Sequence, residues 1–311
     1  MDASVTRIEG SAFNGCYDLT NVIIGSSVVD IGDFAFYGSG LQSVTVGPSV
    51  SQINYLTFSN CYNLRHVILG VSVTLIDREA FTNSAVQSVV GSSVITVEDY
   101  AFEDCAELET VAVGSSLQYI GESAFYNCNQ LRNLSTLDFV AYIGGAAFEG
   151  CSSLPEFSLS ALKQIHYSTF SGTGIEGVLL PSVESISEWA FLYCVHLKRI
   201  LIPSTNLTFV ANTAFAGTCA SSSSIVYVSD AVDPNVYRNK FFRCTVLALP
   251  PSEFPTTLSL EVPYTPACST PGMFYSADNG GTCVVCPAGR FANATGCHVC
   301  PGQCQCRCQC L

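Results

Sequence analysis

Apolar residues recur along this chain with a period much longer than that of a helix or a strand. Phenylalanine returns at intervals of 21 to 24 residues, usually after Ala. Ile or Val stands five residues before each of these Phe residues. The ten pairs are Ile8 and Phe13, Ile31 and Phe36, Ile53 and Phe58, Ile76 and Phe81, Val97 and Phe102, Ile120 and Phe125, Ile143 and Phe148, Ile165 and Phe170, Ile186 and Phe191, and Val210 and Phe215. A fixed offset repeated this often predicts a repeat protein.

The other half of each unit reads Leu-x-x-Val-x-Ile, as in Leu19–Ile24 and Leu64–Leu69. Its last four positions alternate between apolar and polar types, which predicts a short strand with one buried face. The half that contains Ile and Phe is too short for a stable helix. We expect it to form a second short strand followed by one tight helical turn.

A unit of this size cannot fold alone. Ordering its residues costs roughly 30 kcal/mol at about 1.5 kcal/mol each, whereas its few large apolar side chains recover only about 8–15 kcal/mol. Consecutive units must therefore stack, and strands about 4.8 Å apart would form a parallel sheet along the stack. The sequence predicts a solenoid of about ten turns, mostly β with short helical turns.

The unit running from Ile120 through Ala124-Phe125 and Cys128 to Leu131 resembles the BspA-type leucine-rich repeat, a family of surface antigens. We expect this solenoid to occupy residues 1–219, a C-terminal cap and Pro-rich linker to occupy 220–267, and a cysteine-rich module to occupy 268–311. The chain opens inside a repeat, which we interpret as an N-terminal truncation. The resemblance implies an extracellular or cell-surface location and a role in recognition or adhesion.

The cysteines fall into two groups. Six of them follow the repeated Phe by three residues, where other repeats have Ser or Thr, and we expect these to be free thiols that pack in the core. They are Cys16, Cys61, Cys105, Cys128, Cys151 and Cys194.

Nine of the seventeen cysteines lie in the last 44 residues, from Cys268 onward, where the repeat has ended. Two CxxC pairs, each followed by Pro and then a small residue, resemble the cysteine-rich modules of ephrin-receptor-like and TNF-receptor-like proteins, which implies disulfides. The disulfide candidates are Cys219, Cys244, Cys268, Cys283, Cys286, Cys297, Cys300 and Cys304. Zinc held by Cys283, Cys286, Cys297 and Cys300 is the alternative.

Composition excludes several functions. A net charge of −13 and a pI near 4.5 disfavour nucleic acid as a partner. No apolar run reaches the ~20 residues of a membrane span, and the first residues do not resemble a signal peptide. The one GxGxxG match, Gly172–Gly177, precedes a repeat strand, and no catalytic motif is present. We expect no enzyme activity and no cofactor.

The second and fourth residues after each leading Leu should face outward from the predicted sheet, and we expect this face to bind a protein or glycan. The face candidates are Ile23, His66, Ile68, Val90, Thr110, Leu179, Arg199 and Leu201. The N-glycosylation candidates are Asn133, Asn206 and Asn293. The alternatives are an intracellular interaction scaffold with a zinc-binding tail and an ectodomain fragment of a larger membrane receptor. The sequence indicates nothing about the oligomeric state.

Overall fold

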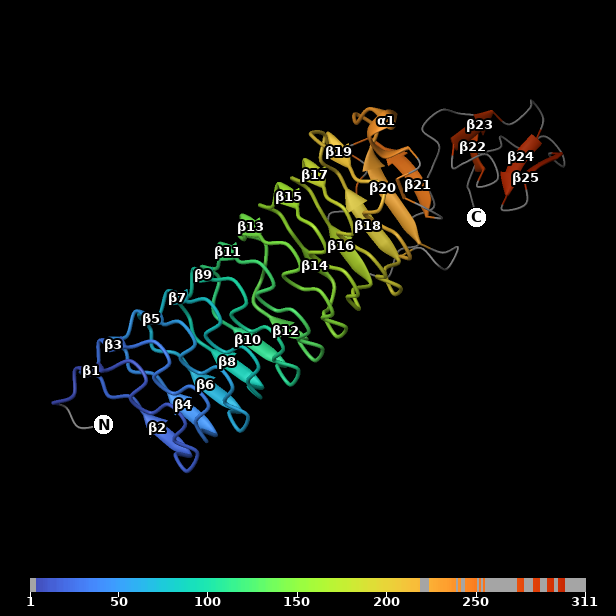
Figure 1. The fold of residues 1–311 in the computed structure, drawn as a ribbon. Helices are drawn as coiled ribbons and strands as arrows, with labels where there is room; N and C mark the ends of the chain where they lie inside the picture. The colour runs from blue at the N-terminus through green and yellow to red at the C-terminus, as the bar shows by residue number, and fades with distance from the viewer. Residues whose placement is uncertain are drawn as a thin grey trace.

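The computed structural model is a stack of chain turns that forms one elongated solenoid (Figure 1). It describes residues 4–218, 224–238, 240–241, 244–250, 252 and 254, together with the backbone of four strands between residues 273 and 299. Each turn of the solenoid contributes one short strand and one longer strand, which belong to two separate rows of parallel strands. The predicted stacking of the repeats is therefore confirmed.

We call the first row the short-strand sheet. Each of its strands has two residues and ends at the repeated Ile or Val. Its members are β1 (Arg7–Ile8), β3 (Asp30–Ile31), β5 (Gln52–Ile53), β7 (Leu75–Ile76), β9 (Thr96–Val97), β11 (Tyr119–Ile120), β13 (Tyr142–Ile143), β15 (Gln164–Ile165), β17 (Ser185–Ile186) and β19 (Phe209–Val210).

We call the second row the long-strand sheet, whose strands have two to five residues. Its members are β2 (Asn21–Ile23), β4 (Ser43–Thr45), β6 (His66–Ile68), β8 (Ser88–Val90), β10 (Thr110–Ala112), β12 (Asn133–Leu134), β14 (Phe157–Ser158), β16 (Gly177–Leu179), β18 (Arg199–Ile202), β20 (Ile225–Ser229) and β21 (Thr245–Leu249). Strands β20 and β21 continue the row inside the segment that we expected to be a cap and linker. The short helix α1 (Pro234–Tyr237) lies between them.

The repeated Phe side chains stack on one another along the interior of the solenoid. Ring centroids of successive Phe residues lie 5.0 to 5.6 Å apart from Phe13 to Phe215. All but Phe13 are completely buried. The repeated Ile and Val residues line the same core. The residues at the fixed positions of the sequence repeat therefore form the interior of the solenoid.

The connection after each short strand differs from the tight helical turn that the sequence predicted. In the second turn, Phe34 and Gly38 both adopt a positive φ, near 60°, and these left-handed residues interrupt any helix. The backbone N–H groups of Phe34, Phe36 and Gly38 instead donate to Tyr55 O, Thr57 O and Ser59 O in the next turn. We call these connecting segments the arcs. Because the arcs are also hydrogen-bonded from turn to turn, strands of only two or three residues are enough to hold successive turns together.

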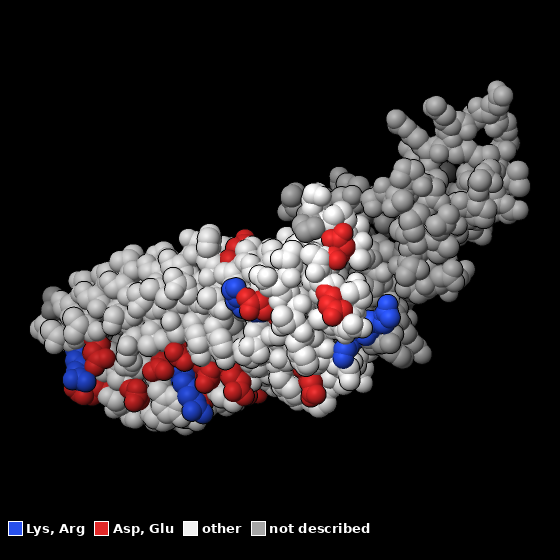
Figure 2. All heavy atoms as spheres, turned by 90° about the horizontal axis from the view of Figure 1, so that it is seen from above, with Lys and Arg blue, Asp and Glu red and all other residues white. Residues whose placement is uncertain are grey.

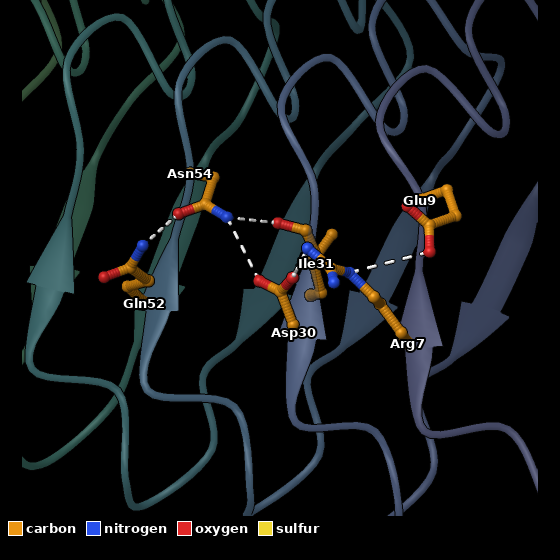
Figure 3. Close-up of polar contacts among 6 residues, drawn as sticks. All are labelled: Arg7, Glu9, Asp30, Ile31, Gln52 and Asn54. Carbon is orange, nitrogen blue, oxygen red and sulfur yellow. Dashed lines mark hydrogen bonds and ion pairs between the residues drawn. The ribbon is translucent and has the colours of Figure 1, made fainter.

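The short-strand sheet is interrupted after β3, at Asn54 (Figure 3). In most turns the backbone N–H after the repeated Ile donates to the Ile carbonyl of the preceding turn, as Asp77 N does to Ile53 O. At this step the side-chain Nδ2 of Asn54 donates to Ile31 O at 2.5 Å. Gln52 donates to Asn54 Oδ1, and Arg7 forms an ion pair with Asp30 at 2.9 Å. A side-chain amide therefore replaces a backbone donor.

The four remaining strands form two antiparallel hairpins. β22 (Met273–Ser276) pairs with β23 (Thr282–Val285), and β24 (Arg290–Asn293) pairs with β25 (Gly296–Val299). The side chains of these strands, including those of Cys283 and Cys297, lie outside the described residues. So do Cys268, Cys286, Cys300 and Cys304 altogether. The choice between disulfides and zinc in this segment stays a prediction.

Candidate functional site: the outward face of the long-strand sheet

The outward-facing positions of the long-strand sheet line up in two columns, as the sequence predicted. From β2 to β10, Ile23, Thr45, Ile68, Val90 and Ala112 are paired in register. The neighbouring column contains Asn21, Ser43, His66, Ser88, Thr110 and Asn133. Because parallel strands lie about 4.8 Å apart, each column is a continuous row of side chains.

The first column is an exposed aliphatic row. Ile23 is 70% exposed, Ile68 54% and Val90 44%, and Thr45 and Ala112 between and beside them are also exposed. The inward neighbours Val44, Val67 and Val89 are buried. The strands themselves alternate between core and solvent, so these aliphatic side chains do not contribute to the core.

The second column is polar, and its members hydrogen-bond to one another across turns. Ser43 Oγ donates to Asn21 Oδ1 at 2.7 Å, and His66 Nδ1 lies 3.0 Å from Ser88 Oγ. Asn133 Nδ2 donates to Thr110 Oγ1 at 3.2 Å. Pairing within the column limits the motion of these side chains and gives the aliphatic row a polar border.

The long-strand sheet is interrupted between β12 and β14, where Pro155 stands at a position whose backbone N–H is a hydrogen-bond donor in other turns. In earlier turns the residue after the leading Leu donates its N–H to the preceding turn, as Arg132 N does to Glu109 O at 3.1 Å. Pro155 follows Leu154 at this position and has no N–H, so it cannot bond to Arg132 O. The strands accordingly separate into a group of six, β2 to β12, and a group of five, β14 to β21.

A hollow of about 220 Å³ lies at this interruption, lined by residues 134–138 and 154–158. Glu156 Oε2 points into the protein there and, among the described residues, accepts no hydrogen bond. The guanidinium of Arg199 lies 3.9 Å from this oxygen. Phe157 fills the adjacent inward position and contacts Phe170, with ring centroids 5.1 Å apart. Phe157 therefore lies in β14, at the point where the pairing between β12 and β14 is broken.

Beyond the interruption the outward face is covered. Leu201, which we expected to be exposed, is only 1% exposed. It packs with Tyr227, Leu247 and Leu249 in a second hydrophobic cluster outside the main core. Leu179, Ile225 and Phe254 pack against this cluster. The prediction for Leu201 was wrong because residues after the last repeat supply cover that the repeat pattern does not encode.

The structure therefore separates the predicted face residues into two sets. Ile23, His66, Ile68, Val90 and Thr110 lie together on the first group of strands. Leu179, Arg199 and Leu201 lie on the second group, where Leu179 and Arg199 are half-buried. Only the first set forms an accessible surface.

The outward positions of the short-strand sheet form a further row that was not among the predicted site residues. One residue before each repeated Ile faces outward there, and Tyr119 stacks on Tyr142 at 4.9 Å between centroids. The sequence does contain a signal for this row, because Tyr119 and Tyr142 each stand immediately before a repeated Ile. His166 lies beside Tyr142, and its partial burial lowers its pKa.

Carboxylates gather on the arcs of the fourth to sixth turns, and Figure 2 shows acidic side chains along one side of this part of the solenoid. Burial, and then Asp99 and Asp77, raise the pKa of Glu98. Burial, and then Asp104 and Glu79, raise the pKa of Glu103. The carboxylates thus disfavour one another's ionisation, which makes this side a poor surface for an anionic partner.

The six repeat cysteines are free, as predicted. All but Cys16 are completely buried. Each buried Sγ donates to the carbonyl of the repeated Phe one turn earlier, at 2.9 to 3.2 Å. Burial raises the pKa of Cys105 to about 12 and that of Cys194 to about 11. These thiols are packing groups rather than nucleophiles.

Cys244 is disulfide-bonded. Cys219, the disulfide candidate nearest to it in the sequence, lies outside the described residues, so the partner of Cys244 stays a prediction. Asn133 and Asn206 are exposed, and Asn293 ends β24. Exposure makes the first two accessible to modification but does not test whether they are glycosylated.

No group of three or more His, Cys, Asp or Glu side chains that could hold a metal is found in the described part of the chain. Among the same residues, no helix is both long and apolar enough to span a bilayer.

The fold defines a leucine-rich-repeat solenoid, a class whose members typically serve as interaction scaffolds. The chain belongs to the family with the BspA type leucine rich repeat region, whose model matches residues 1–95, 76–194 and 163–248 in six copies. This confirms the resemblance proposed for the repeats. No curated relative matches the chain.

Several solved structures are similar. A leucine-rich repeat protein from Bacteroides ovatus is 21% identical, with 79% of this chain and 88% of that chain covered and a TM-score of 0.42. The Treponema pallidum (T. pallidum) leucine-rich repeat protein is 24% identical, with 61% and 82% covered and a TM-score of 0.41. The pneumococcal vaccine antigen PcpA is 17% identical, with 79% and 71% covered and a TM-score of 0.47.

Proposed function

We propose that the chain is a non-enzymatic recognition or adhesion module of the cell surface or extracellular space, and that it binds a protein partner. The binding surface is the outward face of β2 to β10. The observation that carries the proposal is the exposed aliphatic row Ile23, Ile68 and Val90 beside a polar row that is already hydrogen-bonded.

This arrangement suits a protein partner. Protein interfaces combine an apolar centre with a polar rim, and contiguous exposed apolar surface is uncommon where nothing binds. The polar row is rigid before binding, so little side-chain entropy would be lost on association. The charge of −13 favours a neutral or basic partner.

A binding assay with paired substitutions tests this proposal. The full chain would be screened against a panel of purified extracellular proteins, and the best binder measured by surface plasmon resonance. The double variant Ile68→Asp and Val90→Asp should weaken binding at least tenfold. Val195→Asp is the matched control, because Val195 is also 54% exposed but lies away from this face. Equal effects of the two changes, or no binder in the panel, would contradict the proposal.

The cysteines distinguish the proposed location from an intracellular scaffold with a zinc-binding tail. Disulfides persist in oxidising compartments. Alkylation of the unfolded, unreduced native protein should label the six solenoid cysteines and at most one of the nine in the tail, because disulfides within the tail pair cysteines two by two. Labelling of the tail cysteines together with bound zinc would support the intracellular scaffold instead.

A further inference from the structure

A hollow on the arcs of the first three turns lies apart from the outward face of the long-strand sheet. It has a volume of about 250 Å³, and Tyr17, Tyr37, Tyr62, Asn60, Gly38 and Gly40 are among the residues that line it. The hollow is formed by the segments that connect the repeated Phe positions to the long strands. It involves none of the residues assigned to the protein-binding face.

A one-residue deletion in the repeat creates this hollow. The first and third turns read Cys16-Tyr17-Asp18-Leu19 and Cys61-Tyr62-Asn63-Leu64, whereas the second turn reads Ser39-Gly40-Leu41. The shorter turn leaves a gap between its neighbours, and the turns on either side each place a Tyr there. Tyr17 is 79% exposed and Tyr62 63% exposed. Because they lie two turns apart, roughly 10 Å separates their backbones.

Two glycines form the bottom of the gap. A Cβ at Gly40 would lie 1.8 Å from Tyr17 O, so no other residue fits this close approach without moving the backbone. Gly38 adopts a positive φ of 60° and has nothing within 4 Å of its Cβ position. The space above Gly38 is therefore not filled by the protein.

Asn60 holds the rings of this hollow in place. Its Nδ2 donates to the Tyr37 hydroxyl at 2.7 Å. Its Oδ1 accepts from the Tyr62 hydroxyl at 2.9 Å and from Asn83 Nδ2 at 2.9 Å. After these bonds, the Tyr37 hydroxyl can still donate and the Tyr62 hydroxyl can still accept. The hollow thus offers two tyrosine rings held by Asn60, whose hydroxyl groups each keep one unused hydrogen-bonding function.

The same deletion elsewhere in the solenoid lacks these features. The eighth turn is shortened at Thr173-Gly174-Ile175, and a Cβ at Gly174 would again lie 1.8 Å from a carbonyl oxygen, that of Ser152. Its flanking turns, however, carry Ser152 and Val195 where the first hollow has Tyr17 and Tyr62. The deletion alone is a feature of the repeat, whereas the pair of tyrosines is specific to the first hollow.

We propose that this hollow is a binding site for a neutral sugar ring. The C–H groups of a pyranose carry partial positive charge and pack against the negative faces of aromatic rings. Its hydroxyl groups both donate and accept, which matches tyrosine hydroxyls and asparagine amides. No Lys or Arg lines the hollow, so nothing there would neutralise an acidic sugar. The volume lies just below the ~300–1,000 Å³ of typical ligand sites and suits one or two rings rather than a folded peptide.

Saturation-transfer NMR on the full chain tests the proposal with glucose, galactose, mannose, N-acetylglucosamine and the acidic sugar N-acetylneuraminic acid. We expect at least one neutral sugar to bind at millimolar concentration and the acidic sugar not to bind. Tyr17→Ala and Tyr62→Ala should each weaken binding about threefold to tenfold. Tyr62→Phe, which keeps the ring, should weaken it less.

Tyr193→Ala is the matched control, because Tyr193 is also 63% exposed and lies far along the solenoid. Binding should change less than twofold in this variant. The assignment is overturned if no neutral sugar binds, if the Tyr17 and Tyr62 variants bind as well as the control, or if a proline-rich peptide takes the site in preference to every sugar. The protein-binding variants Ile68→Asp and Val90→Asp should leave sugar binding unchanged, which separates failure of this proposal from failure of the other.

Discussion

The outward face of the long-strand sheet is built from the same repeat along its whole length, yet its two halves differ in accessibility. From β2 to β10 the aliphatic row is open to solvent, with Ile68 54% exposed. From β16 to β21 the equivalent positions are occupied by Leu201, Tyr227 and Leu247, which are buried in the second hydrophobic cluster. One sequence pattern therefore produces an accessible surface in one half and an internal contact in the other. The difference arises because Tyr227, Leu247, Leu249 and Phe254 pack together with or against Leu201.

The largest expected effect is on stability when an Asp replaces a leucine in the covered half. Leu201→Asp should lower the free energy of unfolding by more than about 3 kcal/mol, because it places an unpaired carboxylate in the second hydrophobic cluster. Ile68→Asp, at the equivalent position of the open half, should change it by less than about 0.5 kcal/mol. Urea denaturation followed by circular dichroism measures both. Similar losses in the two variants would show that the halves do not differ.

The interior should be as well protected beside the interruption at Pro155 as it is far from it. Burial raises the pKa of Cys105 to about 12, compared with 9 for an ordinary thiol, so its thiolate fraction at pH 8 falls about 1000-fold. Cys151 stands in the turn just before the interruption, and burial raises its pKa as well. Alkylation of the folded protein, followed by peptide mass spectrometry, should leave both cysteines unlabelled while Cys16 reacts. Faster labelling of Cys151 than of Cys105 would show that the interruption reaches the core.

A smaller effect is expected when the missing donor is restored. Pro155→Val returns an N–H to the position that bonds to the preceding turn elsewhere, which gains about 0.5–1.5 kcal/mol. Loss of the proline constraint on the unfolded chain costs about 0.4–1 kcal/mol. The net change in stability should therefore be close to zero. Hydrogen exchange should nevertheless show a protected amide at residue 155, and rapid exchange there would mean that Phe157 keeps the strands apart.

The smallest effects concern charge, and their signs should differ between the halves. The pKa of Glu98 is raised, so the folded state binds its proton more tightly than the unfolded state, and the stability that this carboxyl contributes falls as pH rises through the folded pKa. Glu98→Gln should therefore raise the melting temperature slightly at pH 7 and have no effect near pH 4.

Glu176, in the other half, has the opposite shift. Its pKa is lowered by a hydrogen bond from Lys198 at 2.8 Å and by the charge of that lysine. Its contribution to stability is present above the unfolded pKa and is lost as pH falls through the folded pKa. Glu176→Gln should accordingly lower the melting temperature at pH 7, by little because the pair is exposed. Differential scanning calorimetry at both pH values checks the two signs.

The sequence was sufficient to predict the interior and the register of the solenoid. Ile and Phe at a fixed offset could only be explained by stacking, and the same offset correctly aligned Ile23, Thr45, Ile68 and Val90 in one column. Periodicity succeeds here because burial within a turn is decided by residues of the same and adjacent turns.

The arcs between the strands were predicted less well. A helical turn was expected, but left-handed residues interrupt it, and two residues after Phe58, Phe81, Phe102 and Phe125 these are Asn60, Asn83, Asp104 and Asn127. Asn and Asp tolerate this conformation better than other side chains do. The recurring Asn or Asp was therefore a signal for a left-handed residue. It was missed because the pattern of apolar residues takes no account of this polar position.

Burial of the C-terminal half of the face could not be predicted from the repeat. Phe254 and the strands β20 and β21, which pack in or against the second cluster, come after the last repeated Phe. Whether such a segment folds over a neighbouring surface depends on tertiary contacts that have no period. The hollow between Tyr17 and Tyr62 was missed for a related reason, since a one-residue deletion in one turn leaves the repeated Ile and Phe pairs in place and gives no signal of a gap.

The hydrogen bonds that join one turn to the next also determine how the molecule would respond to a pulling force. Those of the arcs, such as Phe36 N to Thr57 O at 3.0 Å, and those of both sheets all connect successive turns. Tension applied between the two ends would load the bonds of a terminal turn first and peel turns off one by one at low force. A load applied across the turns would have to shear many of these bonds together. A protein of this construction would hold a partner much more firmly against sideways drag than against traction along its length.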